Sequence, residues 1–173
     1  MPGELAAVSL GSNLGPSQAL LARAVETLAA LESCQLEAVS SLYKTRPWGD
    51  VEQPDFLNAV VLLRWQGAAH ALLQQLQSIE RQLGRVRDKK RRWGPRAIDL
   101  DILCFGDLQL ADSDLTLPHP RMAQRRFVLV PLAELAPDLH IPGYGSVASL
   151  LAQCPDQDEP LPVRRPEPWY EQG

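Results

Sequence analysis

Two carboxylates separated by one residue, Asp99 and Asp101, are the residues of this chain best suited to chemistry. They alternate with Ile98, Leu100 and Ile102, and such alternation of polar and apolar residues is typical of a β-strand. Positions i and i+2 of a strand project from the same face, so the two acids share one face and the apolar residues take the other. Oxygen ligands placed in this way suit Mg²⁺, which takes one or two protein carboxylates and completes its shell with phosphate oxygens and water.

A basic loop precedes this strand. Residues 81–96 contain eight of the seventeen Lys and Arg residues and one acid, Asp88; their net +7 leaves −11 for the remainder of a chain whose total is −4. Positive charge focused beside a carboxylate pair favours a small polyphosphate bridged through metal, because nucleic-acid-binding domains are more often basic throughout. A bare Asp-x-Asp pair is also common on solvated edge strands, and a basic loop can simply be solvated, so composition alone leaves both alternatives open.

The length of 173 residues, with 45% hydrophobic and 22% charged residues, is typical of one globular domain. We expect this domain to span residues 1–153 and a loosely held Pro-rich tail to follow over residues 154–173. No apolar run approaches the roughly 20 residues of a membrane span, and the N-terminus lacks a basic region followed by an apolar one. Three widely spaced cysteines favour neither a disulfide framework nor zinc. These features predict a cytoplasmic protein that does not bind membranes, and we expect a monomer.

Hydrophobic periodicity predicts alternating strands and helices. We expect strands over 6–10, 36–45, 56–65, 98–105 and 108–110, and helices over 17–31, 67–83, 122–135 with an interruption at Pro131, and 146–153. The connections are hairpin-length or helical, which predicts an α+β layer fold with a mainly antiparallel sheet flanked by helices. The glycine-containing segment 11–15 lacks the lysine of a P-loop, so we interpret its glycines as a tight turn.

Two further polar residues stand out. Asn58 lies near the start of an otherwise apolar strand, where its amide could recognise the polar edge of a ring or could satisfy an edge position or turn. His119 lies between two prolines, in a rigid and extended context that is also compatible with an ordinary loop histidine. The residues alone leave these alternatives open.

Four sequence blocks, in this order, resemble the 6-hydroxymethyl-7,8-dihydropterin pyrophosphokinases of folate biosynthesis. The blocks are residues 10–15 (LGSNLG), 40–45 followed by 53–58 (SSLYKT, QPDFLN), 84–85 leading to 92–102 (RWGPRAIDLDI), and 117–122 (LPHPRM). The similarity covers about residues 5–145. The resemblance implies a ferredoxin-like αβ sandwich, ATP as co-substrate with two Mg²⁺ ions, and transfer of the β,γ-pyrophosphoryl unit to the pterin hydroxymethyl group with release of AMP.

The resemblance also implies roles for individual residues. Asp99 and Asp101 would ligate both magnesium ions, and Arg85 and Arg96 match the family's catalytic basic residues. The ATP-binding residues would be Gln77, Arg87, Arg92, Trp93, Ile102, Thr116, His119, Arg121 and Arg125. The pterin-binding residues would be Thr45, Arg46, Trp48, Phe56, Asn58 and Phe127, with the ring lying between the two phenylalanines.

The basic loop carries one further implication of the resemblance. Trp93 would act with this loop as a lid that excludes water from the reacting centre. Arg46 and Trp48 depart from the family, which often has smaller apolar residues at these positions, so this wall of the pterin pocket is expected to differ.

Two other classes of protein would share some of these features. A nucleic-acid-binding module on a similar sheet would carry aromatic residues on its exposed face, where this chain has Asp99 and Asp101. A different magnesium-dependent nucleotidyl or glycosyl transferase could use the same acid pair, and only the pterin-side block separates it from the family above. We therefore expect ATP and the hydroxymethyl dihydropterin as small-molecule partners, and no nucleic acid.

Overall fold

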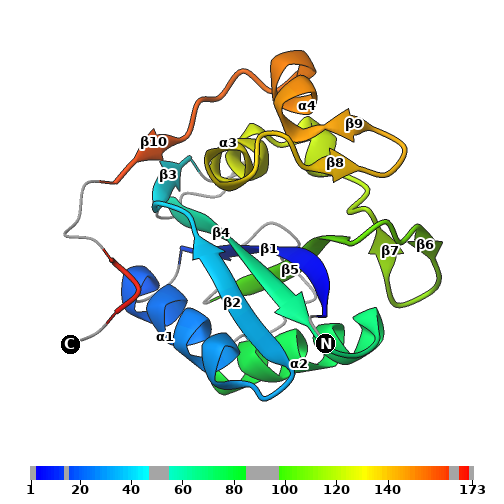
Figure 1. Cartoon of the computed structure of the whole chain (residues 1–173). Helices are drawn as coiled ribbons and strands as arrows, with labels where there is room; N and C mark the ends of the chain where they lie inside the picture. The colour runs from blue at the N-terminus through cyan, green and yellow to red at the C-terminus, as the bar shows by residue number, and fades with distance from the viewer. Residues whose placement is uncertain (1–2, 14–15, 47–54, 85–97, 164–167, 172–173) are drawn as a thin grey trace.

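The computed structural model describes residues 3–13, 16–46, 55–84, 98–163 and 168–171 (Figure 1). Its elements in chain order are β1 (Glu4–Ser12), α1 (Ser17–Ala30), β2 (Cys34–Val39), β3 (Tyr43–Thr45), β4 (Phe56–Trp65), α2 (Ala69–Gln82), β5 (Asp99–Phe105), β6 (Leu110–Ala111), β7 (Thr116–Leu117), the 3₁₀ turn η1 (Met122–Gln124), α3 (Arg126–Leu135), β8 (His140–Ile141), β9 (Gly145–Ser146), α4 (Val147–Gln153) and β10 (Leu161–Pro162). Among the described residues, no helix is long and apolar enough to cross a membrane.

The main sheet is organised around β1, which pairs antiparallel with both β4 and β5. β4 also pairs antiparallel with β2 and β3, and β10 continues the sheet beyond β3. As a result β1 runs parallel to β2, and β4 runs parallel to β5, although neither pair is adjacent. Helix α1 connects the first pair and α2 connects the second, which gives two interlocked βαβ units. The predicted α+β fold with a mainly antiparallel sheet is confirmed.

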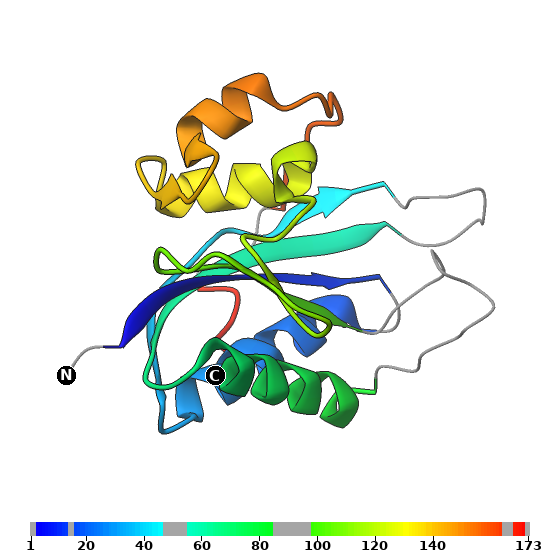
Figure 2. The ribbon, with the colours of Figure 1, turned by 90° about the vertical axis from the view of Figure 1, so that its right-hand side faces the viewer.

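Each face of the sheet has its own apolar core. On one face, Ala6, Val8 and Leu10 of β1 pack in a cluster with residues of α1 and α2. On the other face, Ala7 of β1 packs in a cluster with Leu129 of α3 and other residues of α3 and α4. Figure 2 shows α1 and α2 on one side of the sheet and α3 and α4 on the opposite side. The alternation along β1 therefore supplies both cores, as expected for a strand buried on both faces.

The strand predicted over residues 36–45 is divided in the structure into β2 and β3. The division falls at Ser40, whose hydroxyl donates to the Ser41 carbonyl and accepts a hydrogen bond from the Val60 amide. A serine that bonds the backbone through its side chain offers an alternative to the regular ladder, and this is why continuous alternation in the sequence did not reveal the break.

The helix predicted over residues 122–135 is interrupted at a different place from the one expected. The break lies at Arg125, between η1 and α3, and α3 continues through Pro131. Pro131 lacks only the bond that its amide would donate to the Phe127 carbonyl, and its ring is buried beneath the helix. The segment between the strand predicted over 108–110 and the helix predicted over 122–135 contains a further short strand, β7, which pairs with β6.

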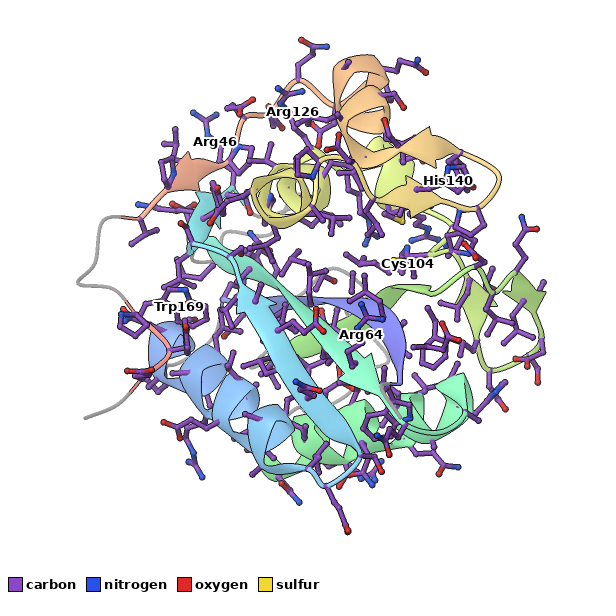
Figure 3. All side chains as sticks on the ribbon, viewed as in Figure 1. Arg46, Arg64, Cys104, Arg126, His140 and Trp169 are labelled. Carbon is purple, nitrogen blue, oxygen red and sulfur yellow. The ribbon has the colours of Figure 1, made fainter. Side chains whose placement is uncertain are left out.

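The C-terminal segment is held to the sheet within its described residues, so the expectation of a loosely held tail is wrong there. β10 pairs with β3, and Trp169 is 3% exposed, with its indole Nε1 donating to the Ser40 carbonyl at 2.8 Å. In Figure 3 the Trp169 side chain lies beside the start of α1 and the sheet. The C-terminal segment has little hydrophobic periodicity and many prolines, so its sequence did not indicate that Trp169 belongs to the core.

We expect Trp169→Ala to lower the free energy of unfolding by about 3–5 kcal/mol, because it removes a buried aromatic ring together with its hydrogen bond. Urea denaturation followed by circular dichroism measures this change. Leu161→Ala is the matched control from the same segment; this side chain is 63% exposed, so the change should stay within about 0.5 kcal/mol. Similar effects of the two substitutions would mean that the segment is not part of the core.

Candidate active site

One row of residues across the sheet brings two predicted parts of the site together. Gly11 of β1 pairs with Asn58 of β4 on one side and with Asp99 of β5 on the other. Residues that pair directly across strands project from the same face, so the Asn58 amide and the Asp99 carboxylate share the face covered by α3. Two strand spacings place their backbones about 10 Å apart.

The two acids of β5 have the orientation predicted by alternation. Asp99 is half-buried and Asp101 is exposed, whereas Ile98, Leu100 and Ile102 are buried in the core on the other face. The backbone between the acids is held from α2, because the Leu100 amide donates to Oε2 of Glu80 at 2.9 Å. Glu80 is itself only 5% exposed. A buried acceptor thus fixes the strand between the two candidate metal ligands.

A β-bulge follows the acids. Val8 pairs with Ile102 and Ala7 with Cys104, which leaves Leu103 as an extra residue in β5. The Leu103 carbonyl accepts a hydrogen bond of 2.8 Å from the His119 amide. The bulge therefore anchors the Pro118–Pro120 loop directly beside the acid pair.

Arg125 lies within electrostatic reach of both acids. Burial lowers the pKa of Arg125, and Arg121 adds to this effect, whereas the carboxylates of Asp101 and Asp99 raise it. The two carboxylates can attract a metal cation, and the two arginines can attract the phosphate oxygens that accompany it. This part of the site suits a polyphosphate that binds together with a metal ion.

His119 is a neutral hydrogen-bond donor in this environment. Burial is the largest cause that lowers its pKa, and together with the charges of Arg125 and Arg121 it brings the pKa from 6.5 to about 4. Its Nδ1 accepts a hydrogen bond of 3.1 Å from the Arg121 amide, so in the neutral ring the proton resides on Nε2. His119 can therefore donate to a phosphate oxygen without adding a charge that the two arginines would repel.

A polar side chain with aromatic neighbours lies at the other end of the row. Asn58 is 7% exposed, and its Nδ2 donates to Oγ1 of Thr45 at 2.8 Å. Phe56 lies two residues earlier on the same face of β4. Phe127, at the start of α3, has the guanidinium carbon of Arg125 5.7 Å from its ring centre. Asn58, Phe56 and Phe127 can therefore provide hydrogen bonds and apolar faces to a planar heterocycle.

Gly11 leaves room for the Asn58 amide in the middle of the row. A Cβ atom at this position would lie 3.3 Å from Asn58 Oδ1, closer than most side-chain contacts. The sequence was interpreted as a turn here, but Gly11 lies within β1 and the strand continues to Ser12. Gly11 directly follows the alternating residues of β1, and this position could have indicated that it belongs to the strand. Glu80 was also missed, because a buried carboxylate on a helix cannot be distinguished from a surface one by spacing.

The remaining predicted residues fall into two groups. Ile102 has its side chain in the core on the opposite face, Gln77 lies on α2 beneath β5, Thr116 lies on β7, and Arg46 is exposed at the end of β3. The structure does not bring these four side chains onto the row. Six predicted residues lie outside the described ranges: Trp48, Arg85, Arg87, Arg92, Trp93 and Arg96.

The donor set fits magnesium. In the part of the chain that the structure describes, no group of three or more His, Cys, Asp or Glu side chains could hold a metal ion. The acid pair, Asp99 and Asp101, offers two carboxylates. This is the number that Mg²⁺ commonly takes from protein, while phosphate and water complete its shell. A structural zinc site would need four protein ligands, and these residues do not provide them.

An α+β sandwich with two acids, two arginines and a neutral histidine on one face defines an enzyme of the phosphate-transferring class. The family model of 7,8-dihydro-6-hydroxymethylpterin-pyrophosphokinase (HPPK) matches residues 7–137. The chain belongs to this family, and the resemblance found in its sequence is confirmed.

Similar curated proteins carry the name 2-amino-4-hydroxy-6-hydroxymethyldihydropteridine pyrophosphokinase. The protein of Methylorubrum extorquens is 52% identical over 136 residues, which cover 79% of this chain and 85% of that protein. The protein of Pseudomonas aeruginosa is 47% identical over 148 residues, which cover 86% and 90%. The predicted class, an ATP-dependent pyrophosphokinase, is confirmed.

Solved structures with the same fold are HPPK-DHPS proteins. One, described as a complex with substrates, has a TM-score of 0.67 at 14% identity and covers 88% of this chain and 43% of its own. Another, from Plasmodium falciparum with pteroate, has a TM-score of 0.67 at 15% identity and covers 88% and 42%. This chain therefore spans less than half of those proteins, and the likeness shows the fold alone.

We expect His119 to titrate near pH 4. Its ring resonances, followed by NMR across pH 3–8 and assigned with a His119→Asn variant, give the pKa directly. The unfolded chain takes up this proton near pH 6.5, so the contribution of His119 to stability is complete above that pH and is lost as the pH falls towards 4. His119→Asn should therefore flatten the dependence of the unfolding temperature on pH over this interval. A His119 pKa at or above 6.5 would contradict the buried, cation-flanked environment.

Proposed function

We propose that this chain transfers the β,γ-pyrophosphoryl unit of ATP to the hydroxymethyl oxygen of 6-hydroxymethyl-7,8-dihydropterin, giving AMP and the pterin diphosphate in folate biosynthesis. The observation that carries this proposal is the row formed by Asn58, Gly11 and Asp99. This row supports the proposal because the Asn58 amide, which could bind a polar ring, and the Asp99 carboxylate, which could bind a metal ion with its phosphate, share one face of the sheet. Membership of the pyrophosphokinase family identifies the two substrates that would meet there.

Asn58 and the two phenylalanines would hold the pterin. An amide side chain offers a donor and an acceptor together, and the pyrimidine edge of a pterin presents the complementary pair. Thr45 restrains Asn58 by accepting its Nδ2–H, so the amide is oriented before the ligand arrives. Phe56 and Phe127 would contribute stacking to the ring faces. Arg46 and Trp48, on the segment that follows β3, are proposed to complete the wall of this pocket.

Arg121, Arg125 and His119 would receive the polyphosphate. In the reaction the pterin hydroxymethyl oxygen forms a bond to the β-phosphorus, and the bond from that phosphorus to the α,β-bridging oxygen breaks. AMP leaves with that oxygen, and the hydroxyl proton passes to solvent. Such transfers depend on in-line positioning and on neutralising the charge of the transferred group, which fixed arginines and a neutral donor provide.

Asp99 and Asp101 would hold two Mg²⁺ ions. Bound there, magnesium would supply positive charge that offsets the negative charge of the group being transferred. Because Glu80 fixes the backbone between the two acids, their separation is set before the nucleotide binds. We also propose a catalytic role for Arg85 and Arg96, nucleotide contacts for Gln77, Arg87, Arg92, Ile102 and Thr116, and a lid role for Trp93. The protein is proposed to act as a cytoplasmic monomer.

The deciding experiment is incubation of the protein with ATP, Mg²⁺ and 6-hydroxymethyl-7,8-dihydropterin, with the nucleotide products separated by chromatography. AMP should appear in equal amount to the pterin diphosphate. Release of ADP would indicate transfer of a single phosphoryl group, and AMP formation without the pterin would indicate another acceptor. Either result would replace the proposed reaction.

We expect Asp99→Asn and Asp101→Asn each to lower kcat about a thousandfold, because each change removes one charged ligand from the metal site without changing its volume. Asp107→Asn is the matched control, since this acid is exposed in the turn just after β5. Initial rates at saturating Mg²⁺ measure the effect. A rate above about one tenth of wild type in either variant would rule out the metal-binding role.

Asn58→Ala should weaken pterin binding about tenfold while leaving the affinity for a non-hydrolysable ATP analogue within twofold, because the lost hydrogen bonds face only the ring. Calorimetric titration of each ligand separates the two effects. Thr45→Val, which keeps the shape but removes the acceptor that orients Asn58, should act in the same direction to a smaller extent. If both ligands weakened equally, Asn58 would be a structural residue.

A further inference from the structure

We propose that the C-terminal segment 156–163 is a positioning strap for the pterin side of the site. One end of this strap holds the start of α3, which carries Phe127, and the other end holds β3, which carries Thr45. The strap would set the separation between these two walls of the pterin pocket and so tune the affinity for the pterin. This inference rests on the proposed function for the identity of the ligand.

The start of α3 has no cap within its own sequence. Its N-cap residue, Arg125, makes no side-chain capping bond, and the first turn contains no acid. The missing acceptor comes from the strap, where Oδ2 of Asp156 receives the Arg126 amide at 3.1 Å. Glu159 adds an ion pair with the Arg126 guanidinium. Both carboxylates are favoured there, because the first amides of a helix are unpaired and carry partial positive charge.

Arg126 is the residue between the two site residues of α3. Fixing its backbone therefore fixes the direction in which Arg125 and Phe127 leave the helix. Arg125 has an additional restraint, namely the attraction of Asp101 and Asp99, whereas Phe127 depends on packing and on the helix itself. Figure 3 shows Arg126 where the start of α3 comes beside the segment that joins α4 to β10. Loss of the cap should consequently disturb the pterin side more than the nucleotide side.

The other end of the strap is bonded to the strand that carries the opposite wall. Leu161 pairs with Lys44 and Pro162 with Tyr43, and the Val163 amide donates to the Leu42 carbonyl at 2.9 Å. The next residue of β3, Thr45, is the acceptor for Asn58. Movement of β3 would thus be transmitted to the amide that reads the pterin edge.

The strap is short enough to act as a spacer. The five residue-to-residue steps from Asp156 to Leu161 can span at most about 18 Å, so the two anchors cannot separate freely. The far end of α3 has its own connection to β3, because Tyr43 donates its hydroxyl to Oε1 of Glu134 at 2.6 Å. Helix and strand are therefore joined at both ends of α3. Weakening the strap should open one end without unfolding the domain.

The strap lies beyond the family match, which ends at residue 137. The bonds described above join the strap to Arg126 and to the region of β3, and this location predicts a larger effect on the pterin than on the nucleotide.

Two variants test the strap from opposite ends. Asp156→Ala removes the acceptor for the Arg126 amide, and Val163→Pro removes the donor to the Leu42 carbonyl. Each should weaken pterin binding on the order of fivefold, the ratio that corresponds to a typical helix cap, while ATP-analogue binding changes less than twofold. The controls are Asp158→Ala, an exposed acid two residues away, and Val163→Ala, which keeps the amide. Asp156→Asn keeps an acceptor and should restore most of the affinity.

The measurements are calorimetric titrations of each ligand, KM for each substrate, and hydrogen exchange of the Arg126 amide, which should accelerate in Asp156→Ala. Equal weakening of both ligands, or unchanged pterin affinity in Asp156→Ala and Val163→Pro, would overturn the strap. Wild-type protein that binds the pterin without releasing AMP would overturn the proposed function. The ratios of pterin affinity between variants and wild type would still show whether the strap positions the pterin side. Wild-type protein that binds no pterin would overturn both.

Discussion

The register of β1 against its two neighbours is the constraint on which the site depends. Gly11 stands opposite both Asn58 and Asp99 only in this register. A slip of one residue on either side would turn the amide or the carboxylate to the opposite face, because strand side chains alternate with a period of two. Such a slip would also expose one of the two apolar cores that β1 supplies. The burial that stabilises the fold therefore enforces the same pairing that assembles the site.

Features that interrupt regular structure bring the phosphate-binding side chains to this frame. The bulge at Leu103 frees a carbonyl that anchors His119, and the break at Arg125 separates η1 from α3 so that Arg125 and Phe127 point from a helix start. Bulges and helix ends are common near sites because they redirect side chains at small energetic cost. In this chain the regular strands define where the candidate metal ligands Asp99 and Asp101 lie, and the irregular residues bring arginines close to them.

Local pattern was sufficient to predict part of this structure. Alternation placed Asp99 and Asp101 on one face, and helical spacing located α1 and α2, because burial of one face controls both patterns. Pattern failed where a single side chain decides the outcome, as at Ser40, which divides a strand, and at Trp169, which holds a Pro-rich segment to the core. It could not predict that Glu80 supports the acid pair, because that contact joins distant segments. The roles assigned to Arg85 and Arg96 came from resemblance, and they lie outside the described residues.

The end strands β10 and β5 of the main sheet each have a feature that limits pairing with another chain, and this has a consequence for the behaviour of the protein in concentrated solution. An exposed sheet edge presents free amides and carbonyls to which another chain can add, and this is a common route to aggregation. At one edge, β10 is two residues long and contains Pro162, which has no amide to offer. At the other edge, the Leu100 amide is already bonded to Glu80. The end strands of the sheet therefore offer few free amides to a misfolded or neighbouring strand. The candidate site can lie at one end of the sheet without making that sheet a template for aggregation.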